Sequence, residues 1–303
     1  MTYAVGVRGG LSVDHLVDAG SGARFGELGG PALFGALGAR LVEGTRVRVF
    51  STLPDDDDRF ERLFERLGVD VSGSRREPRA MRLWILNSAE GRRIVSTAPA
   101  GDIELEGASS SSSSSSDEES APVPVTGTLD GLLDSSPTQA AAVGAGVRVG
   151  IDPHQVPLHR EGIAYLERVA GTDSIVLPSR VQLRLIDADP IAAARTIRDT
   201  VGLDVVARLD KDGIVVVSGA GEWEVRDPAV RVVETTGAGD SSAAAIVAAW
   251  TAGFDLPVAA AFGASAARLA LSEWGHQGLL ADPLSRPLPE ITITTTRTRK
   301  RTA

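Results

Sequence analysis

The sequence predicts an α/β layered fold that carries one additional small β unit. Strand-like and helix-like segments alternate along most of the 303 residues. The strands are short, continuous apolar runs, which is typical of strands buried on both faces of a sheet. Two strand-like runs within residues 81–97 interrupt this alternation and predict a β layer that stands off the main sheet.

Composition excludes several classes of protein. The chain has no cysteine, which excludes disulfides, thiol nucleophiles and cysteine-ligated metals. Its net charge of -9 argues against general nucleic-acid binding, because phosphate contacts need clustered Lys and Arg. Apolar stretches fall short of the ~20 residues that span a bilayer, and the start of the chain lacks a signal-peptide pattern. We therefore expect a soluble cytoplasmic protein with neither a nucleic-acid nor a membrane partner.

The first strand and helix pair illustrates the pattern. Residues 46–51 form an apolar run that predicts a strand, and residues 55–68 predict a helix. Within the helix, apolar side chains fall at the i, i+3, i+4, i+7 spacing of one buried face. The acidic run at 55–58 lies in the first helical turn, where carboxylates suit the positive end of the helix dipole. Capping and solvation explain this run without a metal ion.

The remaining elements follow the same rule. Further buried strands are expected at residues 147–151, 174–177, 205–209 and 214–217. Helices are expected at residues 189–201, 238–253 and 258–272, the last two being rich in alanine.

Two segments look unstructured, and the rest forms one domain over residues 1–291. The segment 107–122 contains eight consecutive serines, which bury nothing and cannot offset their ordering entropy. The tail at 292–303 is rich in threonine, ends in basic residues and is expected to be disordered. The lid-like β unit is expected to use strands at approximately 10–27 and 80–100.

The strongest chemical signal is the string VVETTGAGD at residues 232–240, in which an apolar strand leads into a turn with two glycines and then into an alanine-rich helix. Small residues let the backbone approach a ligand closely, and the first amides of a helix have no internal partner. Together these features predict an anion site formed by Gly237, Ala238, Gly239 and Asp240. Because the Asp240 carboxylate would repel a bound phosphate, we expect it to act as a general base on a hydroxyl that attacks a phosphoryl group.

Residues 234–240 resemble the D-T-x-G-A-G-D signature of the ribokinase-like (PfkB) carbohydrate and nucleoside kinases. Two weaker features agree in order and spacing. The string GLSVDHLV resembles the family's first lid strand, and Asp14 matches the aspartate that holds substrate hydroxyls. Gly29 and Gly30 resemble the diglycine that lies against the sugar. The resemblance runs from about residue 3 to 285.

The resemblance implies a three-layer α/β sandwich with a mostly parallel central sheet and a small β lid. It also implies ATP-dependent phosphorylation of a hydroxymethyl group on a sugar or nucleoside. Asp240 would be the base, and the amides of residues 237–240 would hold the developing phosphoryl charge. Magnesium would accompany ATP, and Glu234 would help to bind a monovalent cation such as K⁺. A homodimer through the lid is implied as well.

The nucleotide is expected to contact five positions that match the donor half of the family's site. These are Thr236, Arg208, Gly213, Ser265 and His276.

The chain departs from the family pattern in this donor half. The N-x-x-E motif that organises Mg²⁺ is replaced by a Ser179 to Gln182 stretch, and the T-x-G turn becomes Arg208 to Asp210. Phe34 replaces an asparagine after the diglycine. Asn87 is the only asparagine in the chain, so these losses do not depend on the alignment.

Three functions remain open from the sequence. The first is a sugar or nucleoside kinase with a remodelled donor site. The second is a protein that kept the fold, lost or changed the reaction, and binds a small ligand or a partner. The third is an enzyme that acts on a sugar or nucleotide phosphate held in the anion site.

Overall fold

The computed structural model describes residues 1–88, 91–96 and 122–298. The strands are β1 (Tyr3–Arg8), β2 (Ser12–Asp18), β3 (Gly22–Gly29), β4 (Thr45–Phe50), β5 (Thr52–Pro54), β6 (Arg75–Glu77), β7 (Met81–Ser88), β8 (Gly91–Ser96), β9 (Gly131–Ser135), β10 (Arg148–Asp152), β11 (Ser174–Val176), β12 (Asp204–Arg208), β13 (Ile214–Val217), β14 (Gly221–Arg226) and β15 (Thr292–Thr298). The helices are α1 (Pro31–Arg40), α2 (Arg59–Arg66), α3 (Gln155–Glu161), α4 (Ile163–Val169), α5 (Arg180–Leu183), α6 (Pro190–Val201), α7 (Ala238–Thr251) and α8 (Leu256–Leu271), with 3₁₀ turns η2 (Asp210–Asp212) and η3 (Gln277–Leu280). The predicted serine-rich loop lies outside the described residues except for Pro122.

The central sheet confirms the predicted α/β fold. Within the described residues its strand order is β15-β14-β13-β12-β11-β10-β9-β1-β4. The pairs from β4 to β12 are parallel, and β13, β14 and β15 continue the sheet in antiparallel pairs. The parallel strands place their carboxyl ends at one edge, which is where open α/β sheets bind ligands.

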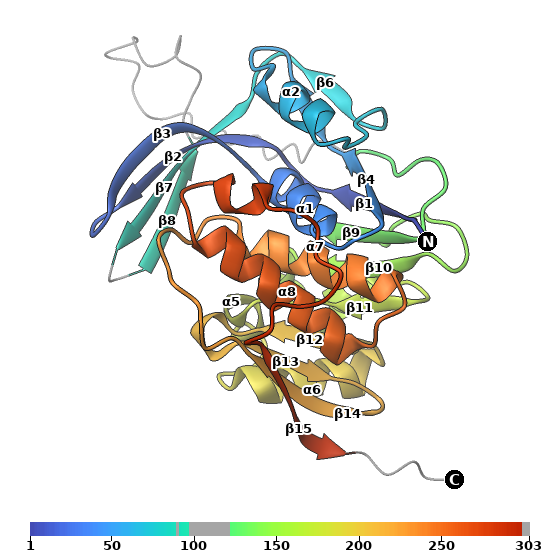
Figure 1. The fold of residues 1–303 in the computed structure, drawn as a ribbon. Helices are drawn as coiled ribbons and strands as arrows, with labels where there is room; N and C mark the ends of the chain where they lie inside the picture. Colours follow the sequence, from blue (N-terminus) through green and yellow to red (C-terminus); the bar gives the residue numbers. More distant parts are fainter. Residues whose placement is uncertain (89–90, 97–121, 299–303) are drawn as a thin grey trace.

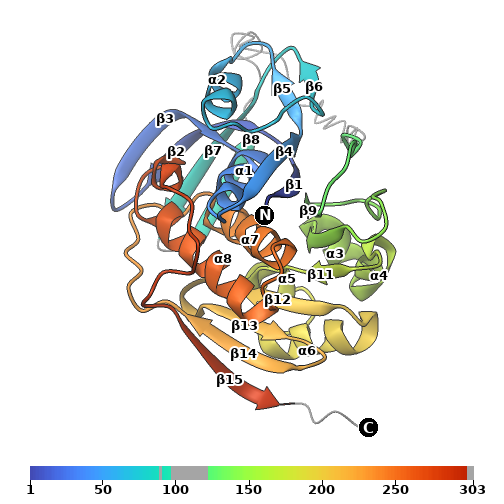
Figure 2. The same ribbon diagram turned by 45° about the vertical axis from the view of Figure 1, so that its right-hand side comes forward.

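Helices cover both faces of this sheet, so the domain has three layers. Figures 1 and 2 show α1, α7 and α8 on one face and α3 to α6 toward the other. Each face has its own apolar core. The first contains Phe34, Phe262 and the alanines of α7 and α8, and the second contains Leu132, Tyr165 and Ile197. Among the described residues no helix has the length and apolar content needed to cross a membrane.

The predicted β unit is a second sheet with the order β3-β2-β7-β8. Figure 1 shows it standing off the main sheet beside α1 and the end of α8. β2 runs parallel to β7, with Asp14 opposite Leu83 and Asp18 opposite Asn87. β7 pairs antiparallel with β8, with Asn87 opposite Arg92. We call this sheet the lid.

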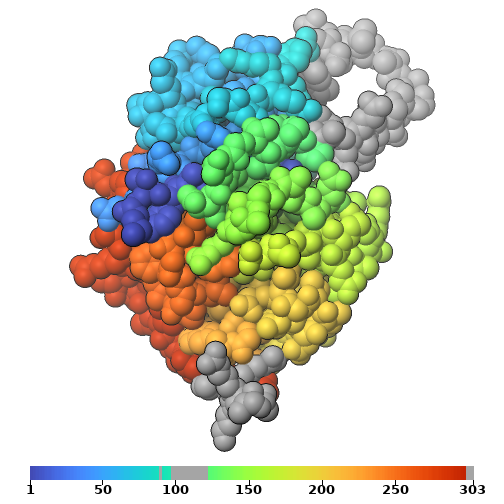
Figure 3. Space-filling view, turned by 90° about the vertical axis from the view of Figure 1, so that its right-hand side faces the viewer, coloured from blue at the N-terminus to red at the C-terminus, as the bar shows by residue number. Residues whose placement is uncertain are grey.

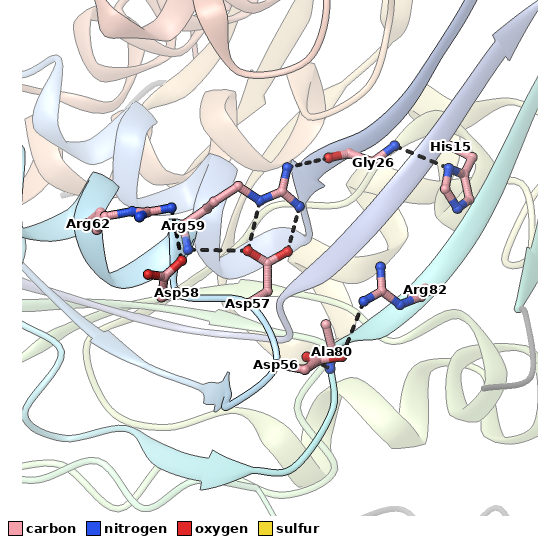
Figure 4. A network of polar contacts seen from close by, with 9 residues as sticks. All are labelled: His15, Gly26, Asp56, Asp57, Asp58, Arg59, Arg62, Ala80 and Arg82. Atoms are coloured by element: carbon pink, nitrogen blue, oxygen red, sulfur yellow. Dashed lines mark hydrogen bonds and ion pairs between the residues drawn. The ribbon is translucent and has the colours of Figure 1, made fainter. Parts of the chain in front are cut away.

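The acidic run does not cap the helix as predicted, because α2 begins at Arg59, and its carboxylates make other contacts. Asp58 precedes α2 without a side-chain capping bond, although it pairs with Arg62 one turn later at 2.9 Å. Asp57 binds Arg59, which donates to the Gly26 carbonyl of β3 at 2.7 Å. Asp56 accepts from the Ala80 amide at 2.7 Å and pairs with Arg82 at 3.2 Å. Figure 4 shows how these contacts fasten the start of α2 to the lid.

The C-terminal segment differs from its prediction. Residues 292–298 were expected to be disordered, yet they form β15, which pairs antiparallel with β14. β-branched threonine and isoleucine favour extended backbone, and β14 offers them an unpaired edge. The central sheet therefore includes residues 292–298, and residues 299–303 lie outside the described part.

The contact between α1 and α7 sets the position of the loop that begins α7. A Cβ at Gly38 of α1 would overlap the backbone of Ser241 in the first turns of α7. The helices can approach this closely only because residue 38 has no side chain. We therefore expect this contact to be sensitive to a single methyl group.

We predict that Gly38→Ala lowers the free energy of unfolding by about 1–3 kcal/mol, because the helices must separate to accept the methyl group. The control is Gly144→Ala, where an added Cβ would meet no atom within 4 Å. Urea denaturation of both variants measures the difference. Equal stability of the two variants would contradict the close packing described here.

Candidate active site

The loop before α7 presents the start of that helix without a side-chain cap. Gly237 is the N-cap residue, and its φ of 78° lies in the left-handed region that favours glycine. The ring of Phe34 lies against Gly237, so a Cβ at residue 237 would overlap the ring. Phe34 thus serves as buried support for the loop, at the position where the sequence departs from the family's asparagine. The amides of Ala238, Gly239 and Asp240 begin the helix, where an anion is favoured.

Asp240 lies in the first turn of α7 and is partly exposed. Burial of the carboxyl group raises its pKa to about 6, and the charge of Asp152 acts in the same direction. The charges of Arg208 and Arg92 oppose this rise. A carboxyl group with a pKa near neutrality can take a proton from a hydroxyl and release it again, which suits a general base.

Arg208 joins three strand ends to the loop. Its guanidinium pairs with Asp152 at 2.8 Å and donates to the carbonyls of Leu177 at 2.6 Å and Gly239 at 2.5 Å. Only 8% of Arg208 is exposed. The guanidinium therefore lies beneath the α7 loop and is held by groups from β10, the end of β11 and the loop itself.

Arg180, a second arginine near the expected nucleotide position, is bound to the η2 turn and not to the α7 loop. Arg180 pairs with Asp210 at 3.0 Å and Asp212 at 2.6 Å, and it donates to the Leu209 carbonyl at 2.5 Å. Asp210 has a φ of 50°, the left-handed conformation that a glycine would adopt more easily. Asp210 thus pairs with Arg180, whereas Arg208 pairs with Asp152.

The stretch that replaces N-x-x-E is structural. Ser179 and Gln182 form a reciprocal capping box at the start of α5. The Gln182 amide also donates to Asp152 at 3.2 Å and to the Pro153 carbonyl at 2.5 Å. These contacts use both ends of the Gln182 amide, and neither residue offers a carboxylate for a hydrated magnesium ion.

Asp14 lies on the lid strand β2 directly above the diglycine. A Cβ at Gly29 would overlap the Asp14 carboxylate, so glycine is required for this approach. Asp14 is only 2% exposed, and its Oδ1 has no hydrogen-bond partner among the described residues. Burial raises the pKa of Asp14 to about 6, Ser12 and Arg92 counteract that rise, and Glu234 adds to it. Gly30, with a φ of 95°, packs on the backbone of Gly10 and Leu11.

Glu234 connects the α7 loop with the lid. Its Oε1 accepts from the amide and hydroxyl of Thr236 at 2.8 and 2.6 Å. The same atom lies 3.5 Å from the Asn87 side-chain nitrogen on β7. Its Oε2 is buried and has no partner among the described residues. The single asparagine of the chain thus reaches the site from the lid.

Two predicted nucleotide residues are buried in the structure. Ser265 is fully buried in α8, where its hydroxyl bonds the Ala261 carbonyl and the Leu288 amide. His276 is buried near α2, and its pKa is lowered by burial and by Arg66 and Arg59. Their contact with a nucleotide stays a prediction. Gly213, by contrast, ends the η2 turn beside Arg208.

A cavity of about 310 Å³ opens at the carboxyl ends of β1, β4 and β9. It is lined by Arg8, Leu11, Thr52, Arg79, Asp134 and Ser135, among others. Arg8 and Asp134 form a bidentate pair at 2.5 and 2.7 Å in its wall. Figure 3 shows the cyan β6 region beside the green segment that leads into β9. Because Leu11 touches Gly30, the cavity adjoins the diglycine.

Sequence reasoning missed four residues of this region. Asp152 and Asp134 each end an apolar strand, and this position was a usable signal, because the carboxyl ends of parallel strands share one edge. Asn87 and Arg92 gave no local signal. Only the pairing of β7 with β8 brings them to the loop.

Comparisons with known proteins test the family resemblance and the fold. Residues 181–282 match the description "pfkB family carbohydrate kinase". A curated relative from Archaeoglobus fulgidus, named "Uncharacterized sugar kinase", is 27% identical over 149 residues, which is 48% of this chain and 59% of that protein. The chain carries a pfkB-family segment. This segment contains the α7 loop, whereas Asp14 and the diglycine lie before it.

Solved structures show the same fold over nearly the whole chain. Ribokinase from Cryptococcus neoformans, in complex with ADP, aligns with a TM-score of 0.68 at 17% identity, covering 94% of this chain and 98% of that one. Aminoimidazole riboside kinase from Salmonella enterica aligns with a TM-score of 0.67 at 20% identity, covering 92% and 97%. The chain therefore has the ribokinase-like fold that the sequence predicted.

We predict that Arg208→Met lowers the free energy of unfolding by about 3–5 kcal/mol, because it leaves Asp152 buried without its cation. The matched control is Arg62→Met, whose ion pair with Asp58 is two-thirds exposed. Exposed pairs of this kind contribute about 0–1 kcal/mol. Chemical denaturation measures both changes. A loss for Arg208→Met no larger than that of the control would contradict the role of the buried guanidinium.

Proposed function

We propose that this protein transfers a phosphoryl group from ATP to a hydroxymethyl group of a sugar or nucleoside. One observation carries the proposal. Asp240, with a pKa raised to about 6, lies beside the uncapped amides that begin α7. The lid places a second buried carboxylate, Asp14, over the diglycine. The site thus offers a base, an anion site and a carboxylate that can accept hydrogen bonds from substrate hydroxyls, all between the lid and the start of α7.

The reaction follows from these positions. Asp14 accepts hydrogen bonds from acceptor hydroxyls and orients the sugar against Gly29 and Gly30. Asp240 takes the proton of the attacking hydroxyl of the acceptor. At the same time, the oxygen of that hydroxyl forms a bond to the γ-phosphorus of ATP. The bond between that phosphorus and the bridging oxygen breaks, and its electron pair leaves with ADP. The amides of residues 237–240 stabilise the charge on the transferred group.

The cavity beside the diglycine is where we place the far end of the acceptor. Its volume suits a small ligand, since binding pockets begin at roughly 300 Å³. The donor would lie along the η2 turn, near Thr236, Arg208 and Gly213. Contacts from Ser265 and His276 would require a rearrangement of their surroundings.

The two expected metal ions fit the site differently. The Ser179 and Gln182 contacts leave no carboxylate for magnesium at the family's position, so no step is assigned to that ion. Glu234 fits a monovalent cation, because its buried Oε2 lacks a partner among the described residues. A cation held there would supply a fixed positive charge beneath the α7 loop.

The test is an assay of sugars and nucleosides with ATP, in which we expect ADP and a phosphorylated product. We predict that Asp240→Asn lowers kcat at least ~100-fold, because a positioned base contributes roughly that factor. Asp58→Asn, which changes an exposed carboxylate, is the control. Failure of every acceptor, or an active Asp240→Asn protein, would refute the proposal.

The same assay has a predicted pH dependence. Asp240 and Asp14 act as carboxylates, and both have a pKa raised to about 6. Activity should therefore be full well above pH 6 and fall as the pH drops through this value. The acidic limb of kcat/KM between pH 4.5 and 8 measures it. A limb near pH 4, the range of ordinary carboxyl groups, would show that burial does not control these side chains.

A second function is favoured by the donor half of the site. The capping box at Ser179 and Gln182 and the binding of Arg180 by Asp210 and Asp212 suit a protein that keeps a small-molecule site without catalysis. Calorimetry with ATP separates the two functions. Micromolar ATP binding favours the kinase, and sugar binding without ATP binding favours the second function.

We also propose a homodimer formed through the outer face of the lid. His15, Phe25 and Trp84 cluster on the face opposite Asp14, and Phe25 is 64% exposed. Light scattering should give twice the 31.5 kDa chain mass. Phe25→Glu should return that mass to one chain, because it places a charge in an apolar contact. A wild-type particle of one chain mass would contradict the dimer.

A further inference from the structure

An arginine of the lid, Arg92, belongs to the face of that sheet that meets the α7 loop. Arg92 lies on β8 directly opposite Asn87 of β7. Residues paired across a ladder project from the same face of a sheet, so both side chains leave the lid on one side. Asn87 reaches Glu234 on that side, with 3.5 Å between its nitrogen and Oε1. Arg92 therefore extends toward the loop that carries Asp240.

Other arginines near the site are already bound. Arg208 is held by Asp152 and two carbonyls, and Arg180 is held by two aspartates. Arg8 forms its bidentate pair with Asp134 in the cavity wall. Within the described part of the chain, the Arg92 side chain makes neither a hydrogen bond nor an ion pair. With respect to these residues, its guanidinium is available for a ligand.

Electrostatics give a second indication of where Arg92 lies. Its charge lowers the pKa of Asp14 and also that of Asp240, against the effect of burial in both cases. Asp14 belongs to the acceptor side and Asp240 to the side of the transferred group. The Arg92 charge is therefore within electrostatic reach of both carboxylates.

We propose that Arg92 is a lid-borne catalytic residue that contacts the phosphoryl group during its transfer to the acceptor. This inference rests on the proposed kinase function. The guanidinium would donate hydrogen bonds to the non-bridging oxygens of the γ-phosphoryl group. A planar guanidinium suits this contact because it can donate two parallel hydrogen bonds to two oxygens of a phosphate. Arg92 would supply positive charge from the lid. This charge matters because the chain lacks the N-x-x-E carboxylate that would organise a metal ion.

The contact also makes transfer depend on the position of the lid. Arg92 and Asn87 leave the same face, so the Asn87 contact with Glu234 holds Arg92 over the loop. An acceptor that donates hydrogen bonds to Asp14 contacts β2, which belongs to the same lid sheet as Arg92. We therefore expect Arg92 to act on the transfer step more than on acceptor binding.

The experiment compares Arg92→Gln and Arg92→Lys with Arg93→Gln. Arg93 is the adjacent residue, it pairs with Leu86, and it projects from the opposite face of the lid. With an acceptor found in the panel, Arg92→Gln should lower kcat by roughly 100-fold, the effect of losing one transition-state donor. The acceptor KM should change less than threefold. Arg92→Lys should recover part of kcat, and Arg93→Gln should stay within threefold of the wild type.

A binding measurement provides a readout that a merely structural role would not move. Calorimetry should show that the wild type binds AMP-PNP more tightly than ADP, because only the former has a γ-phosphoryl group. Arg92→Gln should lose this preference while its affinity for ADP stays the same. Arg93→Gln should keep the preference.

The outcomes separate this inference from the function on which it rests. An active wild type with equal kcat in Arg92→Gln and Arg93→Gln would overturn the role of Arg92 alone. A higher acceptor KM with unchanged kcat would overturn it as well, and would assign Arg92 to the acceptor. A wild type that neither binds AMP-PNP nor phosphorylates any acceptor would refute the proposed kinase and this inference together.

Discussion

The site depends on one buried guanidinium. Arg208 holds Asp152 at the end of β10, the Leu177 carbonyl after β11 and the Gly239 carbonyl at the start of α7. These groups come from parts of the chain that lie up to about 90 residues apart, and the arginine fixes them at one edge of the sheet. Because a buried ion pair is costly to break, the loop that carries Asp240 is held rigidly. A preorganised anion site requires such rigidity.

The charges around this loop are arranged differently from those that the sequence resemblance implies. Asp152 and Gln182 bind each other where a magnesium-organising pair was expected, and Arg180 is taken up by Asp210 and Asp212. The donor half is therefore internally neutralised. Two carboxylates keep raised pKa values, Asp14 on the acceptor side and Asp240 in the first turn of α7. The negative charge of a transferred phosphoryl group would then be stabilised mainly by the positive charge of the lid and of the N-terminal end of helix α7.

Much of this arrangement could be predicted from the sequence, because local patterns encode it. The strand, turn and helix at residues 234–251 are a local signal, and so is the off-pattern hairpin that became β7 and β8. The strand β15 was missed because a short threonine-rich tail becomes a strand only where an open sheet edge receives it. Asn87 and Arg92 were missed for a related reason. Their place at the site follows from the registers of β2, β7 and β8, which single-sequence patterns do not define.

We propose that the amides of residues 237–240 hold the transferred phosphoryl group while Arg208 stays in its buried position. A crystal structure of the protein with AMP-PNP and an acceptor sugar or nucleoside is the decisive experiment. We expect the γ-phosphoryl group within hydrogen-bonding distance of those amides, with the contacts of Arg208 to Asp152 and Gly239 unchanged. A nucleotide bound elsewhere, or an Arg208 side chain swung out to meet the phosphates, would contradict it.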